Sequence, residues 1–385
     1  MKLPYWRLSA FYFFYFATIG TFLPFWSVFL QQSGFTAIEI GELSALLVAT
    51  KIIAPNFWGW LADKLSWRML LIRLCASLAA GFFAGFLYLQ GYQWYALVTV
   101  LFSFFWNASL PQFEAVTLLH LRAHALQVYS QIRLWGSVGF IFAVLGIGWY
   151  LEYFSIHYLP HIIISLLLAN ALIAFITPEP LFSKTAHQAN GLWALLLRTE
   201  VIGFFLVYMF LQIAHGPYYV FYSVYLNLHG YSSTATGLLW AFGVLAEIIM
   251  FMLAGGLQAR FSLRQLLLAS LALSTLRWWL TAYWVDQLYW QLFAQLLHAA
   301  SFGITHVVAI QLLYHYFGPA HQGKCQALYS SFSFGLGGMI GSLYSGYFWD
   351  SLGPSLVFLI AAFASGMAFL IAYLTVGKPI RLVTQ

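Results

Sequence analysis

Long apolar segments alternate with short polar connections along the whole chain. A run of about 20 apolar residues is long enough to cross a bilayer as a helix, and runs of this length recur from one end to the other. The predicted spans are residues 8–30, 39–62, 69–89, 93–118, 126–151, 159–177, 201–226, 235–257, 265–284, 288–314, 326–349 and 355–376. We therefore predict an all-α membrane protein of about twelve transmembrane helices.

The two halves of the chain repeat one another at a fixed offset. Gly59 lies 196 positions before Gly255, and Arg68 lies the same distance before Arg264. Upstream, the same register aligns Gly20, Phe25, Ser27, Val28, Leu30, Gly34, Gly41 and Val48 with Gly216, Phe221, Ser223, Val224, Leu226, Gly230, Gly237 and Val244. Such an ungapped match indicates two homologous halves. We predict a six-helix half at 1–177, a polar cytoplasmic linker at 178–200 and a second six-helix half at 201–385.

Composition agrees with a protein that lies in the lipid bilayer. Of its 385 residues 62% are hydrophobic and 7% are charged, whereas soluble domains carry roughly 25% charged residues. The two cysteines, Cys75 and Cys325, indicate neither a disulfide framework nor a metal site. The net charge of +6 does not indicate nucleic-acid binding, because membrane topology accounts for the basic residues. The run 8–30 is too long for a signal peptide and is predicted as the first span.

Basic residues gather at one side of the predicted spans. The connections on the opposite side hold Glu39, Glu152, Asp286 and Asp350 and no lysine or arginine. By the positive-inside rule, both termini are predicted to be cytoplasmic, in a bacterial inner membrane. The basic residues that carry this prediction are Lys2, Arg7, Lys64, Arg68, Arg122, Lys184, Arg198, Arg260, Arg264, Lys324, Lys378 and Arg381.

Charged side chains also fall deep inside predicted spans, at Lys51, Glu114, Arg133, Glu247 and Arg277. Each costs about 3 kcal/mol at the bilayer centre on insertion scales, so such residues usually face a cavity or each other. Lys51 and Glu247 are related by the repeat offset. They are therefore candidates to pair across the interface between the halves, and a purely structural pair is the alternative.

Helical rise predicts which of these charges lie at the same depth. Glu114 and Arg133 are each about 14 Å from the turn between their spans, at 1.5 Å per residue, so we expect them to pair. Arg277 and His298 are each about 16 Å from the turn between theirs. His215 precedes Gly216 and Pro217, and we expect it in a broken-helix turn rather than at a ligand.

The connection between the second and third predicted spans carries a recognisable motif: Gly59, Asp63, Lys64 and Arg68. Two halves of six predicted helices, with this motif between the second and third spans, resemble the major facilitator superfamily. The resemblance covers nearly the whole chain. It implies a transporter in which Asp63 contributes to gating through a neighbouring helix N-terminus. The second copy has Ala259 in place of the aspartate.

Two further resemblances concern the buried charges. The run PQFEA at 111–115, followed by RLWG at 133–136, resembles the fourth and fifth spans of the lactose permease group of proton symporters. That resemblance implies that Glu114 and Arg133 contact the solute. Arg277 and His298 similarly resemble that group's proton-coupling arginine and histidine. The carboxylate expected one turn after the histidine is Ser301 here, which leaves Glu247 or Glu114 to carry the proton.

The runs FLPFWSV at 22–28, RLWGSV at 133–138 and VLAEII at 244–249 are similar to the phenylpropionate permease family. This similarity implies uptake of an aromatic acid. Aromatic side chains near the buried charges suit a cavity for a ring-bearing solute, namely Tyr15, Trp106, Trp135, Tyr218 and Tyr219.

We therefore predict a monomeric secondary transporter that takes up a small organic solute with protons and needs no other cofactor. The predicted substrate-binding residues are Glu114, Arg133, Lys51, Trp135 and Tyr15. The predicted coupling group is Glu247, Arg277 and His298. A sugar or nucleoside cargo, proton-coupled efflux and facilitated diffusion stay open. An intramembrane transferase is the alternative class, but the sequence has no Asp-rich motif and no nucleotide-binding loop.

Overall fold

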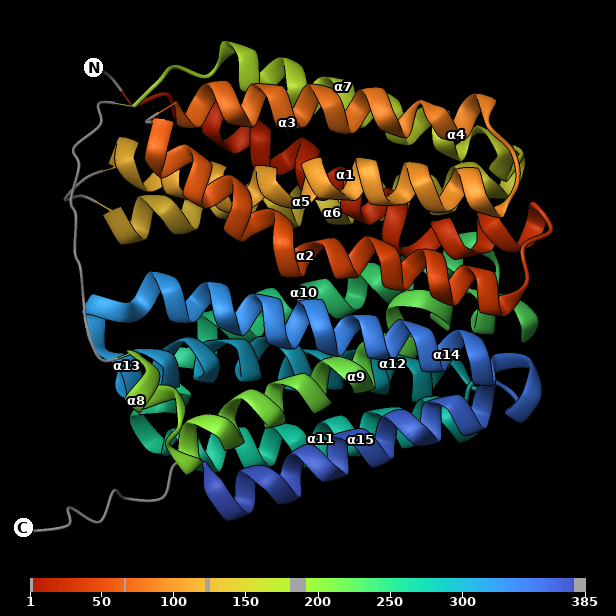
Figure 1. The fold of residues 1–385 in the computed structure, drawn as a ribbon. Coiled ribbons are helices and arrows are strands. Elements are labelled where there is room, and N and C mark those ends of the chain that lie inside the picture. Colours follow the sequence, from red (N-terminus) through yellow and green to blue (C-terminus); the bar gives the residue numbers. More distant parts are fainter. Residues whose placement is uncertain (1–2, 66, 122–124, 181–191, 377–385) are drawn as a thin grey trace, which may run out of the picture. The chain divides into compact units, whose positions relative to one another are not determined.

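The computed structural model describes residues 3–65, 67–121, 125–180 and 192–376. Every regular element within these ranges is a helix (Figure 1), which confirms the all-α prediction. Most of the predicted linker, 181–191, lies outside the described residues, and so do Lys2, Arg122, Lys184, Lys378 and Arg381. The long helices are α1 (Tyr5–Gln32), α2 (Ala37–Leu65), α3 (Arg68–Phe83), α5 (Tyr92–Leu121), α6 (Ala125–Tyr153), α7 (Leu159–Ile176), α9 (Thr199–Leu228), α10 (Ser233–Arg260), α11 (Leu263–Tyr283), α12 (Leu288–His298), α13 (Thr305–Tyr329), α14 (Gly338–Leu352) and α15 (Pro354–Thr375).

Each predicted span falls on helical structure, with three local differences. The third span is divided at Ala84 into α3 and the short α4 (Gly85–Tyr88). The tenth and eleventh contain π-helical segments, at Ala299–Ile304 and Ser330–Gly337. α9 runs through Pro217 without a break, so the expected broken-helix turn at His215 is wrong. Proline is tolerated inside membrane helices, because neighbouring groups satisfy the backbone groups that it leaves unpaired.

Nine helical segments of the described chain are long and apolar enough to cross a membrane, judged by length and composition. The predicted spans 39–62, 265–284 and 326–349 are not among these nine. Polar side chains lower the hydropathy of these three segments, as Lys51 does in α2 and Arg277 in α11. The number of about twelve spans therefore stays a prediction, while the multi-pass character is established.

Contacts divide the chain into two compact units. Unit 1 comprises residues 1–185, 217–241 and 342–351, and unit 2 comprises 186–216, 242–341 and 352–385. The division passes through α9, α10 and α14, each of which contributes a segment to both units.

In unit 1, α1 packs along α6 and α7, α2 packs along α5, and α3 lies against α5 and α7. Glycine allows the closest of these approaches. A Cβ on Gly20 of α1 would lie 2.6 Å from the carbonyl oxygen of Phe140 on α6, a separation that real Cβ atoms do not adopt. The buried Asn170 of α7 donates a 2.9 Å hydrogen bond to the carbonyl of Phe11 on α1. These contacts hold α6, which carries Arg133, in register with α1.

In unit 2, α11 packs along α15 and against α12 and α13. A buried cluster around Phe204, Tyr208, Leu271 and Val308 joins α11, α13 and α15 to α9. The Tyr208 hydroxyl donates a 2.8 Å hydrogen bond to the backbone carbonyl of Thr305, just after the first π-helical segment. π-Helical turns are rare and frequently occur at functional sites; this one positions Ser301.

Candidate functional site

Glu114 and Arg133 form an ion pair in unit 1, as their equal depth predicts. Glu114 projects from α5 and Arg133 from α6, and Nε of the arginine lies 3.7 Å from Oε1 of the glutamate. The side chains keep 37% and 32% of their surface exposed. Both charges are therefore open to a solute as well as to each other.

Aromatic rings surround this ion pair. The guanidinium carbon of Arg133 lies 4.1 Å from the centre of the Phe16 ring and 5.4 Å from that of Tyr12. The ring centre of Tyr15, on the same helix as these rings, lies 5.4 Å from that of Trp106. The structure thus places Tyr15 and Trp106 together in unit 1, and the Tyr15 ring centre lies 5.6 Å from that of Phe16, which contacts Arg133.

Trp135 occupies a different side of α6 from Arg133, because residues two apart on a helix do not face one another. Its indole N–H donates a 3.3 Å hydrogen bond to the hydroxyl of Tyr5, and its ring lies 5.7 Å from that of Trp6. Trp135 is thus not grouped with Arg133, and its predicted contact with a solute stays a prediction.

Lys51 is half-buried in the middle of α2. The preceding residue, Thr50, donates to Ser103 at 3.0 Å and accepts from Asn107 at 2.8 Å. These hydrogen bonds fix α2 against α5 at the depth of Lys51. Within the described part of unit 1, no carboxylate pairs with Lys51, and its predicted contact with a solute stays a prediction.

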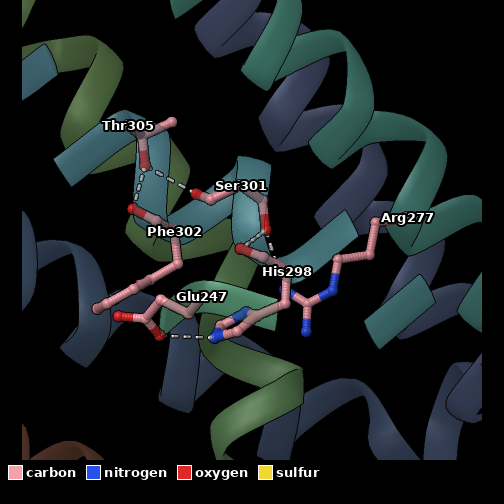
Figure 2. Close-up of polar contacts among 6 residues, drawn as sticks. All are labelled: Glu247, Arg277, His298, Ser301, Phe302 and Thr305. Atoms are coloured by element: carbon pink, nitrogen blue, oxygen red, sulfur yellow. Dashed lines mark hydrogen bonds and ion pairs between the residues drawn. The ribbon is translucent and has the colours of Figure 1, made fainter. Parts of the chain in front are cut away.

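The predicted coupling residues come together in unit 2. Nε2 of His298 lies 3.7 Å from Oε2 of Glu247, and both side chains are largely buried. Figure 2 shows these two groups pointing toward each other, with Arg277 approaching Ser301 beside them. Nη1 of Arg277, a residue only 1% exposed, donates to the Ser301 hydroxyl at 3.1 Å. Three ionisable groups from α10, α11 and α12 therefore share one buried site.

Ser301 occupies the position where the lactose permease resemblance implies a carboxylate. Its hydroxyl accepts from Arg277 and donates to the carbonyl of His298 at 3.3 Å. Its own carbonyl accepts from Thr305 at 2.8 Å. The serine therefore orients the arginine without adding a negative charge, and Glu247 is the carboxylate of this site.

His215 is a member of this group that the sequence interpretation missed. It is fully buried, and its ring lies 6.3 Å from His298 and 5.0 Å from Trp278. Its Nδ1 lies 2.7 Å from the carbonyl oxygen of Leu211, which only accepts, so Nδ1 carries a hydrogen. The available signal was its place in the middle of an apolar span, where an ionisable residue is a functional candidate.

The motif between α2 and α3 forms a compact polar cluster. Arg68, the first residue of α3, pairs with Asp63 and donates to Gln112 of α5 at 3.4 Å. A Cβ on Gly59 would lie 3.3 Å from the amide nitrogen of the same glutamine. Lys64 instead lies over the Trp60 ring at 5.1 Å. Asp63 thus contacts the start of the neighbouring helix α3 through the side chain of Arg68.

Two carboxylates at the predicted outer ends of unit 1 were also missed as site residues. Glu42 of α2 accepts hydrogen bonds from the hydroxyls of Tyr92 at 2.6 Å and Tyr347 at 2.7 Å. Glu152 of α6 accepts from the backbone N–H of Thr234 at 2.7 Å, at the start of α10. Both link helices of the first predicted half to segments of the second.

A cavity of about 190 Å³ lies beside the link between Glu152 and Thr234. It is lined by uncharged side chains of α1, α6, α9 and α10, including Phe25, Ser223, Asn227 and Thr236. Among the described residues, no three histidine, cysteine or acidic side chains are grouped to hold a metal ion. His157 and His161, four residues apart, line a second cavity of about 570 Å³ in unit 1.

Comparisons with known proteins agree with this architecture. The model of the MFS_1 like family matches residues 5–360. The probable 3-phenylpropionic acid transporter of Escherichia coli (strain K12) is 30% identical over 385 residues, which cover 94% of this chain and 96% of that protein. The maltose permease of Geobacillus stearothermophilus is 27% identical over 88% of this chain and 86% of its own. The crystal structure of the nucleoside transporter NupG has a TM-score of 0.84 at 18% identity, over 98% of this chain and 100% of that one, and this likeness concerns the fold.

Proposed function

Because the chain belongs to the MFS_1 like family of the major facilitator superfamily, we propose that it takes up a small aromatic carboxylate together with protons. The protein is a multi-pass membrane transporter and not an enzyme. In the proposed cycle both termini are cytoplasmic, and the two predicted halves expose a central site to either side of the bacterial inner membrane in turn.

The observation that carries this proposal is the half-exposed Arg133 beside Glu114 and the Phe16 ring. A guanidinium group recognises a carboxylate through two parallel hydrogen bonds. Lys51 supplies a second cation in this proposal, whereas the rings of Tyr15 and Trp106 are buried and pack together behind the site-facing rings. The name of the relative that is 30% identical supports an aromatic acid as the cargo.

Proton coupling is assigned to Glu247 with His298 and Arg277. A buried carboxylate that gains a proton loses its charge and with it the cost of desolvation. It also releases its hold on a basic partner, here His298 at 3.7 Å. A proton shifts the inward–outward equilibrium only through its different affinity for the two states. The Glu247–His298 contact is the proposed source of that difference.

The second candidate cargo is a sugar, which the 27% identity to a maltose permease favours. Glu114 and Arg133 would then bind hydroxyl groups instead of a carboxylate. A solute with no negative charge leaves Lys51 without a function in binding, and this is why we place the aromatic acid first.

The test is uptake of labelled 3-phenylpropionate, maltose and a nucleoside into membrane vesicles, with and without an imposed inward proton gradient. We expect gradient-driven accumulation of 3-phenylpropionate alone. Glu247→Gln is expected to abolish accumulation and to retain exchange at equal concentrations on both sides. Asp350→Asn, which removes an exposed carboxylate, is the matched control and should accumulate normally.

Other outcomes would overturn parts of the proposal. Accumulation of maltose but not of 3-phenylpropionate would replace the cargo. Loss of solute from loaded vesicles on imposing the gradient would indicate efflux. Normal accumulation by Glu247→Gln would remove this residue from coupling and transfer the function to Glu114.

A further inference from the structure

The distance between Arg133 and Glu114 is longer than their charges alone favour. A charge-assisted hydrogen bond between a guanidinium and a carboxylate is about 2.7–2.9 Å long and is frequently doubled. Here the closest atoms, Nε and Oε1, are 3.7 Å apart. Another contact therefore holds the guanidinium away from full engagement with the glutamate.

That contact is an aromatic shelf formed by Phe16 and Tyr12 of α1. The Phe16 ring lies 4.1 Å from the guanidinium carbon and the Tyr12 ring 5.4 Å from it. Tyr12 is fully buried, and its hydroxyl lies 3.2 Å from Thr117 of α5. The Tyr129 hydroxyl also lies against the side chains of Tyr12 and Arg133. The shelf is thus anchored in the packing of unit 1.

Gly136, one turn after Arg133 on α6, provides the room for this stacking. A Cβ at this position would lie 2.8 Å from Nη1 of Arg133 and 2.9 Å from Cδ2 of Phe16. The added carbon would have to displace the guanidinium, the ring or both. Gly146, further along the same helix, has no atom within 4 Å of its built Cβ, so a side chain is tolerated there.

We propose that Phe16 and Gly136 are positioning residues that make the site selective for a planar carboxylate. Phe16 covers one face of the guanidinium, and Glu114 lies on its Nε side. In this proposal the two oxygens of a solute carboxylate form two parallel bonds along the edge of the guanidinium that does not face Glu114. Without the shelf, Arg133 turns to Glu114 and its charge is neutralised within the protein. This inference rests on the proposed function, in which Arg133 binds the solute.

The experiment measures initial uptake rates in vesicles for 3-phenylpropionate, with 3-phenylpropionamide as the competing neutral analogue. Phe16→Leu is expected to raise KM for the acid about tenfold, as loss of a partly desolvated cation–π contact would, with Vmax nearly unchanged. The preference for the acid over the amide should fall by the same factor. Phe16→Tyr, which keeps the ring, should restore both values.

Gly136→Ala is expected to repeat the effect of Phe16→Leu from the other helix. Gly146→Ala is its matched control on α6. Phe13→Leu is the control on α1, because Phe13 contacts Phe14 and Phe142 instead of the arginine. Both controls should keep the wild-type KM and the wild-type preference, with each rate normalised to the amount of folded protein.

Two results would overturn the inference, and they differ from failure of the proposed function. If the wild type transports the acid and Phe16→Leu lowers only Vmax or protein abundance, the shelf is structural while the proposed function stands. If the wild type takes up the amide as readily as the acid, the selectivity is absent. If it transports no aryl carboxylate at all, the proposed cargo and the selectivity fail together.

Discussion

Arg68 and Arg264 occupy equivalent positions in the two halves and have different partners. Arg68 pairs with Asp63 and contacts Gln112. The second copy has Ala259 where the first has Asp63, and Arg264 instead donates to the backbone carbonyls of Tyr373 and Val376, both at 2.6 Å. These carbonyls belong to the end of α15, where cations stabilise the unpaired acceptors of a helix. Loss of the acid has thus changed a side-chain pair into a helix cap.

Arg264→Ala is therefore expected to destabilise unit 2. Two hydrogen bonds from a charged donor to otherwise unpaired carbonyls contribute about 1–3 kcal/mol at a half-buried position. The thermal unfolding midpoint of the purified protein in detergent should fall by several degrees. Arg260→Ala, which removes an exposed arginine at the end of α10, is the control. An equal decrease in both variants would show that general charge, and not the cap, is responsible.

Some residue contacts could be predicted from the sequence and others could not, depending on whether helical geometry determines them. Depth along two consecutive helices predicted the Glu114–Arg133 pair, because helical rise is constant and the turn between them is short. The same rule placed Arg277 and His298 at one level, but it did not predict that the arginine would bond Ser301. His215 was missed because a proline two residues later indicates a turn, whereas tertiary packing keeps α9 helical.

At the scale of elements, helices of unit 1 meet at pairs of glycines near the predicted outer ends. A Cβ on Gly41 of α2 would lie 2.7 Å from the Cα of Gly346 on α14. A Cβ on Gly237 of α10 would lie 2.6 Å from the carbonyl oxygen of Val144 on α6. Gly41 and Gly237 are related by the repeat offset, so the two contacts are internal equivalents. Each contact has a carboxylate beside it, Glu42 or Glu152.

Tyr347→Phe is expected to loosen the contact between α2 and α14, whereas Tyr92→Phe is not. Both tyrosines donate to Glu42, but Tyr92 belongs to the same predicted half as the glutamate and Tyr347 to the other half. A cysteine in place of Asn227, which lines the 190 Å³ cavity, reports the opening. Its labelling by an external, membrane-impermeant maleimide should be faster in Tyr347→Phe.

Tyr92→Phe is the matched control for this experiment, since it also removes one tyrosine hydroxyl that donates a hydrogen bond to Glu42. The native Cys75 and Cys325 are buried, so the introduced thiol is the reactive one. Equal labelling rates in the two variants would contradict a closing function for the Glu42–Tyr347 bond.

Hydrophobic patterning predicted the helices well because a membrane span needs both length and apolarity. It failed to resolve features within a helix. The π-helical segments at Ala299–Ile304 and Ser330–Gly337 have the same apolar composition as their α-helical surroundings. These segments follow from packing and not from local composition. The kink at Gly318, with φ of 64°, is different, because it lies between the predicted spans 288–314 and 326–349, where the sequence predicts a connection.

At the scale of the whole molecule, the repeat carries different charges in its two copies. Unit 1 holds Lys51, Glu114 and Arg133, and unit 2 holds Glu247, Arg277 and His298. Lys51 and Glu247 are equivalent by the repeat, yet Glu247 has His298 as a neighbour at 3.7 Å. Duplication followed by divergence would account for the division that we propose, with solute binding in one half and proton coupling in the other. The alternative is that Lys51 and Glu247 pair between the halves.

A double-mutant comparison distinguishes separate functions from a Lys51–Glu247 pair. If the functions are separate, Lys51→Gln raises KM for 3-phenylpropionate about tenfold, which corresponds to about 1.4 kcal/mol of binding free energy, and coupling is kept. Glu247→Gln abolishes accumulation, and the double variant shows both defects at full size, because independent sites are additive. If the residues pair, each single variant leaves a buried charge without its partner, and the double variant recovers stability and transport. Because Glu247 already has His298 as a partner at 3.7 Å, we expect additivity. Recovery in the double variant would instead mean that the halves are joined by this ion pair and that Lys51 is not a solute ligand.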